Sequence, residues 1–153
     1  MAYELPVQLQ QLGTDITTEQ LRYHTKMVLI TKEFTFDAAH HLHAYNGKCH
    51  ELHGHTYRLQ VSVRARPNAI GLGLDFGVIK QIVQEHVVQK LDHHYLNRVL
   101  PPMNTTAENM IVWMYEQIDA ALTAQENVAQ LERLILWETP TSSVELTREA
   151  MMT

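Results

Sequence analysis

The stretch of this chain with the most potential chemistry runs from residue 49 to residue 55 and reads Cys-His-Glu-Leu-His-Gly-His. It contains the only cysteine of the chain, Cys49, and it ends in two histidines that are two positions apart. Six of the ten histidines fall within 16 residues: His40, His41, His43, His50, His53 and His55. Imidazole and thiolate groups gathered this densely are typical of a metal site, because both bind transition metals such as zinc.

Two expected strands bring three of these histidines to one face. Side chains two residues apart in a strand point to the same side of a sheet, so His53 and His55 share a face. In the strand expected over residues 53–66, the same face continues with Tyr57, Leu59, Val61, Val63 and Ala65. In the strand expected over residues 27–42, His40 shares a face with Phe34, Phe36 and Ala38. If the two strands are neighbours, the three histidines emerge together on an apolar side of the sheet.

Three imidazoles at the edge of an apolar face suit Zn2+. Catalytic zinc sites use three protein ligands and keep the fourth position open for water or substrate. Two alternatives remain: Cys49 supplies a fourth ligand and closes a structural zinc site, or a histidine-rich loop binds metal without a function. An iron site of the cupin type is disfavoured, because it needs a glutamate a few residues after the second histidine, where this chain has Leu59 and Gln60.

Residues 91–97, Leu-Asp-His-His-Tyr-Leu-Asn, form a second group with possible chemistry. An aspartate beside a histidine, as in Asp92-His93, is the pairing that orients a catalytic imidazole. A structural role competes with this hypothesis, since histidine near the C-terminus of a helix interacts favourably with the helix dipole. Spacing leaves His94 as an alternative to His93, and the position directly after Asp92 favours His93.

Two further carboxylates occupy positions where a helix begins or a strand ends. Thr105-Thr-Ala-Glu108 fits a capping box, with Thr105 as N-cap and Glu108 as third helical residue. This structural role is a sufficient explanation for both residues. Glu138 follows an apolar strand expected over residues 131–137, and a carboxylate there is a candidate anchor for a ligand.

The order of the expected elements predicts a two-layer α+β subunit. We expect Asp75 to cap a helix over residues 76–91, and a second helix to run from Thr105 to about residue 124. A last strand is expected over residues 142–147. The resulting order is strand, strand, helix, helix, strand, strand, so we predict an antiparallel sheet with two helices on one face.

The chain is expected to form one domain preceded by an extension. Residues 1–27 have no firm hydrophobic period, and they are expected to form an N-terminal extension with a short helix capped by Asp15 or Thr17. Residues 28–153 are expected to form a single domain with a core of its own.

Composition restricts the class of protein. A net charge of −5 and the lack of a basic stripe argue against nucleic-acid binding. No apolar run approaches membrane-spanning length, the N-terminus has no signal-peptide pattern, and one cysteine allows no internal disulfide. We therefore expect a cytoplasmic protein that binds neither membrane nor nucleic acid.

Five separated motifs resemble those of the 6-pyruvoyl-tetrahydropterin synthase superfamily, and they span about residues 30–148. In chain order they are Phe-Asp-Ala-Ala-His40, Cys49-x-x-x-His53-Gly-His55, Leu-Asp92-His93-His94-Tyr-Leu-Asn, Thr106-Ala-Glu108-Asn and Glu138-Thr. The resemblance implies a tunnelling fold, in which ββααββ subunits join edge to edge into a barrel. It also implies Zn2+ on His40, His53 and His55. Active sites between the subunits of a homohexamer, a dimer of trimers, are implied as well.

The three residues between Cys49 and His53 resemble the bacterial 6-carboxy-5,6,7,8-tetrahydropterin synthase branch, of queuosine and 7-deazapurine biosynthesis. The resemblance implies 7,8-dihydroneopterin triphosphate as substrate, and 6-carboxy-tetrahydropterin, acetaldehyde and triphosphate as products. It assigns proton transfer to Cys49, Asp92 and His93, and pterin binding to Glu138, Thr106 and Glu108. The alternative is the sister reaction, which eliminates triphosphate and gives the pyruvoyl product. The segment after His55 lacks obvious lysines, so the triphosphate-binding residues stay unassigned.

Overall fold

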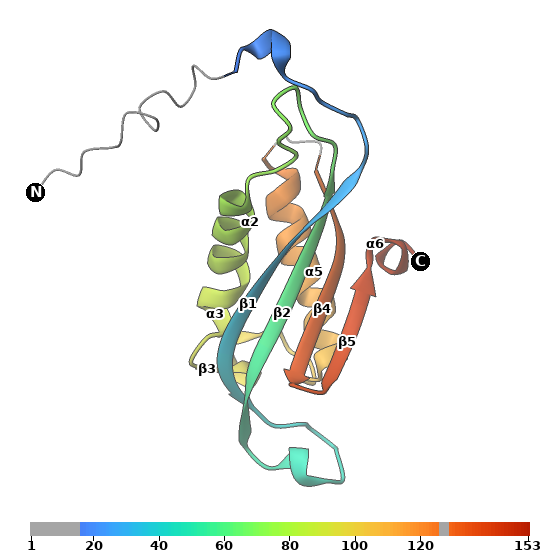
Figure 1. The fold of residues 1–153 in the computed structure, drawn as a ribbon. Coiled ribbons are helices and arrows are strands. Elements are labelled where there is room, and N and C mark those ends of the chain that lie inside the picture. The colour runs from blue at the N-terminus through green and yellow to red at the C-terminus, as the bar shows by residue number, and fades with distance from the viewer. Residues whose placement is uncertain (1–15, 126–128) are drawn as a thin grey trace, which may run out of the picture.

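The computed structural model describes residues 16–125 and 129–153 and contains a five-stranded sheet covered on one face by helices (Figure 1). The strands are β1 (Val28–His40), β2 (His53–Ala65), β3 (His94–Tyr95), β4 (Gln130–Thr139) and β5 (Ser142–Thr147). Their order in the sheet is β3-β1-β2-β4-β5. The α+β class and the two-layer arrangement predicted from the sequence are confirmed.

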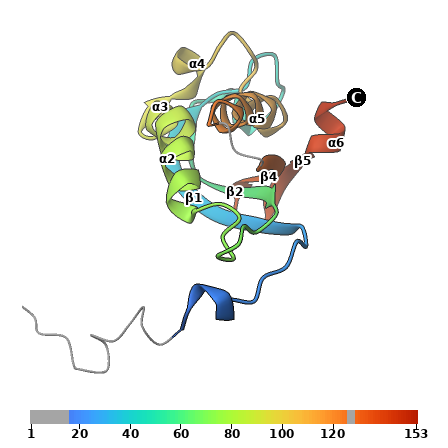
Figure 2. The same cartoon turned by 90° about the horizontal axis from the view of Figure 1, so that it is seen from above.

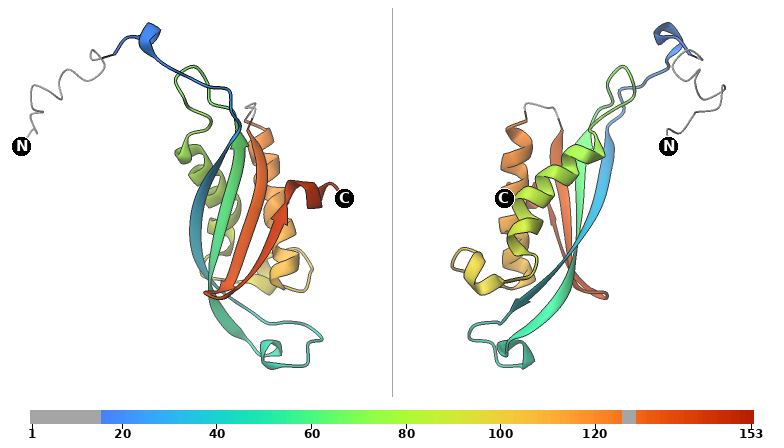
Figure 3. Two further views of the ribbon diagram at one scale, coloured as in Figure 1. Left: turned by 45° about the vertical axis from the view of Figure 1, so that its right-hand side comes forward. Right: turned by 90° about the vertical axis from the view of Figure 1, so that its left-hand side faces the viewer.

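Strands β1 and β2 form a long antiparallel hairpin whose register carries the histidines. Pairing runs from Val28 opposite Ala65 to His40 opposite His53, and Ala38 is opposite His55. Alternation with period two buries one face of this hairpin, as the sequence predicted: Phe34, Phe36, Ala38, Tyr57, Leu59, Val61 and Val63. The hairpin end and its connecting loop, residues 41–52, project beyond the helices (Figure 3).

The helical layer consists of two long segments that lie on the same side of the sheet (Figure 2). The first contains α2 (Phe76–Val83), a π-helical stretch (Gln84–Val88) and α3 (Gln89–Leu91), which together match the predicted helix over residues 76–91. Asp75 caps it as expected, since its Oδ1 accepts a hydrogen bond from Gly77 N at 2.6 Å. The second is α5 (Ala107–Thr123).

Short helices complete the chain on either side of α5. They are α4 (Leu96–Val99) before it and α6 (Arg148–Met151) near the C-terminus. Among the described residues, no helix combines the length and apolar character needed to cross a membrane.

The core lies between the sheet and the helices. Its largest fully buried side chains come from both layers: Phe36, Tyr57, Leu59, Ile79, Leu91, Leu96, Met110, Met114, Ile118, Leu131, Leu134 and Leu136. Fully burying an aliphatic side chain of this size stabilises a fold by about 1.5–3 kcal/mol. The packed core therefore holds the hairpin against α5. This packing also fixes the position of the hairpin end.

The start of α5 differs from the prediction. Thr106, not Thr105, is the N-cap, and its Oγ1 accepts a hydrogen bond from Asn109 N at 3.2 Å. The predicted capping box of Thr105 and Glu108 is therefore wrong, because Asn109 is the third helical residue. Thr105 is unavailable for capping because its side chain is fully buried against the end of β1.

Strand β3 and the N-terminal segment add two details. The two residues of β3 pair in parallel with Ala38 and Ala39 at the edge of β1, whereas the prediction had only antiparallel strands. A single 3-10 turn, Thr18–Gln20, follows Thr17, whose N–H donates to Gln20 Oε1 at 2.7 Å. Asp15, the other predicted cap, lies outside the described residues. The division into an extension over 1–27 and a domain over 28–153 stays a prediction.

Candidate metal centre and adjoining cavity

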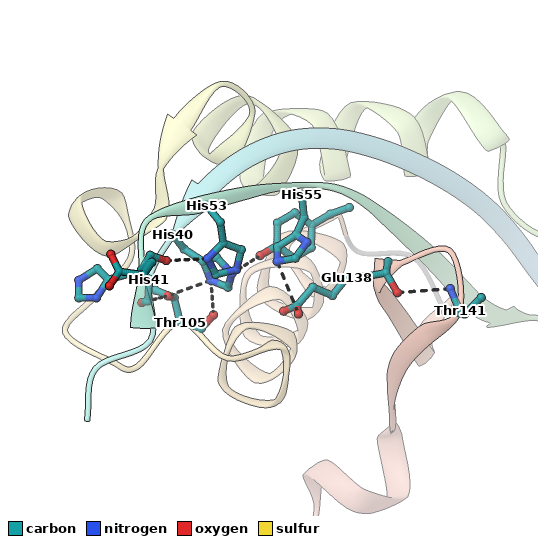
Figure 4. A network of polar contacts seen from close by, with 10 residues as sticks. His40, His41, His53, His55, Thr105, Glu138 and Thr141 are labelled. Carbon is teal, nitrogen blue, oxygen red and sulfur yellow. Dashed lines mark hydrogen bonds and ion pairs between the residues drawn. The ribbon is translucent and has the colours of Figure 1, made fainter. Parts of the chain in front are cut away.

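Three histidines meet at the end of the β1–β2 hairpin, on the face that the helices cover (Figure 4). One ring nitrogen from each of His40, His53 and His55 lies within 4.8 Å of the others. The ring centroid of His53 lies 4.7 Å from the ring centroid of His40 and 4.7 Å from that of His55. The convergence follows from the register, because His40 is directly opposite His53, and His55 follows two residues later on the same face.

Hydrogen bonds to backbone oxygens orient two of these rings. His40 Nδ1 lies 2.8 Å from the backbone oxygen of Thr105, and His53 Nδ1 lies 2.7 Å from that of Glu51. A carbonyl oxygen can only accept, so each Nδ1 carries a proton, and in the neutral form of each ring Nε2 keeps its lone pair. Metal-binding histidines typically donate their second nitrogen in this way.

The remaining ring nitrogens fit a zinc ion. His53 Nε2 and His55 Nε2 are buried and have no hydrogen-bond partner among the described residues. A buried polar atom without a partner costs about 1–3 kcal/mol, so such atoms call for a ligand. Three neutral imidazoles are a donor set that Zn2+ prefers, and they would hold it with one position left for substrate.

Burial favours the neutral form of two of these imidazoles, His40 and His55. The pKa of His40 is lowered to about 4, chiefly by burial and to a lesser extent by the neighbouring histidines, while the hydrogen bond to the Thr105 carbonyl opposes the shift. Burial also lowers the pKa of His55, and the Glu138 carboxylate opposes this shift. Neutral imidazole is the form that binds a metal, so the cluster is ready to bind one at neutral pH.

A cavity of about 480 Å³ adjoins the cluster and contains four of the predicted site residues: Cys49, Thr106, Glu108 and Glu138. Glu138 connects the cavity to the cluster, because its Oε1 lies 3.6 Å from His55 Nε2 (Figure 4). Cys49 is half-buried and does not belong to the group of donor atoms within 4.8 Å of one another. The geometry therefore favours an open three-histidine site over a closed one with Cys49 as fourth ligand.

Asp92 and His93 lie elsewhere. His93 Nδ1 is 2.9 Å from Asp92 Oδ2, and both groups lie at the edge of β1 beside Asp37. His93 lines a different cavity, of about 590 Å³, which shares no lining residue with the cavity that contains Cys49. Within one chain, the aspartate–histidine pair and the thiol therefore face separate spaces.

His93 and His94 differ in their contacts with Asp92. The carboxylate contacts the ring of His93, whereas His94 Nδ1 bonds to the backbone oxygen of Asp92 at 2.7 Å. The contact with the carboxylate raises the pKa of His93. The backbone N–H of Asp37, and then His93, lower the pKa of Asp92.

Sequence reasoning missed the residues that support the cluster. Thr105 was expected only as a helix cap, yet its backbone oxygen orients His40 and its hydroxyl lies 3.2 Å from His41 O. Tyr57 was expected only in the core, yet its hydroxyl lies 3.4 Å from His40 Nε2. The doubled threonine at positions 105–106 was a weak signal, because only one of two adjacent residues can be the N-cap.

The fold and the cluster define a two-layer α+β protein with a three-histidine candidate metal centre. A family model described as 6-pyruvoyl tetrahydropterin synthase matches residues 29–149. The chain belongs to that family.

Known proteins of the family resemble the chain in sequence and in structure. The 6-carboxy-5,6,7,8-tetrahydropterin synthase of Synechocystis is 37% identical over 100 residues, 62% of this chain and 78% of that protein. A dihydroneopterin monophosphate aldolase of Pyrococcus furiosus is 38% identical over 112 residues, 73% of this chain and 90% of that protein. The solved 6-pyruvoyl tetrahydropterin synthase of Caenorhabditis elegans superposes with a TM-score of 0.72 at 22% identity, covering 82% and 99% of the two chains. The subunit fold expected for the tunnelling architecture is confirmed, and its assembly into a barrel stays a prediction.

Proposed function

We propose that this protein is a carbon–carbon lyase that uses Zn2+ to convert 7,8-dihydroneopterin triphosphate and water into 6-carboxy-5,6,7,8-tetrahydropterin, acetaldehyde and triphosphate. The observation that carries the proposal is the three-histidine cluster, in which His53 Nε2 and His55 Nε2 have no hydrogen-bond partner among the described residues. Glu138, 3.6 Å from His55 Nε2, connects the cluster to a cavity that is lined by a thiol and two carboxylates. The name of the Synechocystis relative supports the carboxy product. So does the three-residue spacing between Cys49 and His53.

The cavity has groups suited to each part of a pterin. The carboxylates of Glu138 and Glu108 can each accept hydrogen bonds from the guanidine-like edge of the ring, a planar array of donors. The Thr106 hydroxyl accepts from Asn109 N, which leaves its own hydrogen for a ligand. We assign these three residues to substrate binding.

The histidines and the cysteine face the reacting side chain of the substrate. Zinc on His40, His53 and His55 would acidify the substrate hydroxyls and stabilise negative charge on their oxygens. Cys49 is assigned the transfer of a proton, since a positioned thiol can act as a general acid or base. His93, paired with Asp92, is assigned the exchange of protons with that thiol.

The separate cavities of Cys49 and His93 require a second chain for this exchange. We infer that His93 of one subunit approaches Cys49 of its neighbour, so that the active site lies between subunits of a homohexamer. Exposed sheet edges at β5 and at β1 beyond β3 support edge-to-edge association, because unpaired edges are normally covered. A stable monomer in light scattering at micromolar concentration would contradict this inference.

Mass spectrometry of the products tests the function. The zinc-loaded protein is mixed with 7,8-dihydroneopterin triphosphate, and in parallel with the monophosphate, because a similar protein is named an aldolase of the monophosphate. A 6-carboxy product with acetaldehyde supports the proposal. A pyruvoyl product, or turnover of the monophosphate alone, would replace it with one of these alternatives. Queuosine or 7-deazapurine biosynthesis in the cytoplasm is the setting that we propose for the carboxy product.

A further inference from the structure

Two asparagine side chains hold the chain where it leaves β1. Asn97 Oδ1 accepts a hydrogen bond from His41 N at 3.1 Å, and Asn97 Nδ2 donates to His41 O at 3.0 Å. Asn104 binds His43 in the same way, with distances of 2.9 Å to His43 N and 3.0 Å to His43 O. Each side chain thus satisfies both backbone groups of one residue, as a neighbouring strand does in a sheet.

Leu42, the residue between His41 and His43, makes its backbone hydrogen bonds on the opposite side, toward Cys49 and His50. Leu42 N donates to the backbone oxygen of Cys49 at 2.8 Å, and His50 Nδ1 donates to Leu42 O at 3.2 Å. Residues 41–43 therefore have partners on alternating edges, which is the pattern of a strand between two neighbours. The asparagines form one edge, and the turn that contains Cys49 forms the other.

The same frame supports the metal centre. The hydroxyl of Thr105 lies 3.3 Å from Asn97 Oδ1, and the backbone oxygen of Thr105 orients His40. Asn104 precedes Thr105 directly, and its own backbone oxygen accepts from Asn109 Nδ2 at 2.9 Å, in the first turn of α5. The same few residues, Asn97, Asn104 and Thr105, therefore help to position both Cys49 and His40.

We propose that Asn97 and Asn104 are positioning residues, which act through the backbone of residues 41–43 to fix the thiol of Cys49 relative to the three-histidine site. The expected effect on catalysis rests on the proposed function. The mechanical link, meaning the hydrogen bonds that connect the two asparagines through residues 41–43 to Cys49, does not. A displacement of about 1 Å in a reacting group can cost on the order of 100-fold in rate. Loss of either asparagine is therefore expected to lower kcat at least tenfold, measured at a zinc concentration that keeps the site fully occupied.

The test uses Asn97→Ala and Asn104→Ala in the full, zinc-loaded chain, with the exposed Asn46→Ala in the same loop as control. Hydrogen exchange of the peptide over residues 41–50 reports the mechanical link, and alkylation by iodoacetamide reports the thiol, since Cys49 is the only cysteine. We expect exchange and alkylation to become roughly tenfold faster or more in both variants, while exchange in residues 57–65 stays at the wild-type rate. The control is expected to match the wild type.

Asn104→Asp is a second variant that keeps the oxygen for His43 N and loses only the donor to His43 O. It provides a folded intermediate case if the alanine variants are too unstable, and its exchange should lie between wild type and alanine. Wild-type rates of exchange and alkylation in these variants overturn the proposal, even if kcat falls. A wild-type enzyme without turnover overturns the proposed function instead, because exchange and alkylation still measure the link.

Discussion

Nδ1 of His93 lies 2.9 Å from Oδ2 of Asp92, although His93 has the left-handed backbone angle φ of 58°. A residue other than glycine is held in this region only where its surroundings fix it. Here the N–H of His93 donates to Asp37 O at 2.6 Å, and Asp37 N donates to Asp92 Oδ1 at 2.9 Å. The edge of β1 therefore presents a preformed aspartate–histidine pair to solvent.

Replacing Asp92 by asparagine is expected to lower the pKa of His93 toward the ordinary value of about 6.5. The carboxylate raises this pKa by a hydrogen bond and by its charge, and an amide has no charge. Because the folded-state pKa is raised, the stabilisation from the pair is complete below the unfolded value and is lost as the pH rises through the folded value. NMR titration of the imidazole measures the change. The control variant Asp119→Asn should leave the pKa of His93 at its wild-type value. A wild-type pKa of His93 in Asp92→Asn would contradict the pairing of His93 with the Asp92 carboxylate.

Replacing Cys49 by alanine distinguishes an open zinc site from a closed one. We expect the variant to retain its fold and one zinc per site and to lose at least about 100-fold in kcat, since general acid–base groups typically contribute 10²–10⁴-fold. Elemental analysis and product formation, measured on the same sample, give both answers. Loss of zinc together with the fold would identify Cys49 as a structural ligand, and full activity would remove it from the mechanism.

Thr105→Val should weaken zinc binding about tenfold without unfolding the protein. The substitution removes the hydroxyl, which lies 3.1 Å from His40 Nδ1, and retains the backbone oxygen that orients the ring. Loss of partners that support a metal ligand typically costs 10–100-fold in affinity, and the retained carbonyl predicts the lower end. Competition with a chromophoric chelator measures the affinity. Thr123→Val, at the exposed end of α5, is the matched control, and equal affinities in both variants would show that the hydroxyl is unimportant.

Asp75→Ala is expected to destabilise the fold by about 1 kcal/mol, because it removes the cap of α2. The side chain accepts from Gly77 N and lines neither the cavity with Cys49 nor the cavity with His93, so the effect is expected on stability alone. Thermal unfolding of the metal-free protein should show Tm lower by roughly 2–4 °C. Asp75→Asn retains an oxygen acceptor and should behave like the wild type. Equal Tm values for the alanine and wild-type proteins would be incompatible with this cap.

The alternation of side chains was sufficient to predict the hairpin and the convergence of its histidines. Strand period is a local property, so the faces of Phe36, Tyr57 and His55 follow directly from the order of residues. The limits of the first helix and its cap at Asp75 are local in the same sense. The pterin chemistry was predicted from the resemblance of the motifs, and the family is confirmed.

Contacts between segments that are far apart in the sequence could not be predicted from local patterns. Thr105 and Thr106 are chemically identical, and only packing against the end of β1 decides that Thr105 is buried and Thr106 is the cap. Asn97 and Asn104 are ordinary polar residues until the fold brings them to residues 41–43, more than 50 positions away.

The amino-acid sequence by itself determined the long strands and helices, the face that carries the three histidines and the family, because these depend on short periods and on residue types. The tertiary structure decided which groups share a cavity. It brings Cys49, on the loop after β1, to the same cavity as Glu138. It places His93 in a different cavity, because the segment after α3 pairs with the edge of β1. Such separations depend on the packing of whole elements, and no local pattern of residues encodes them.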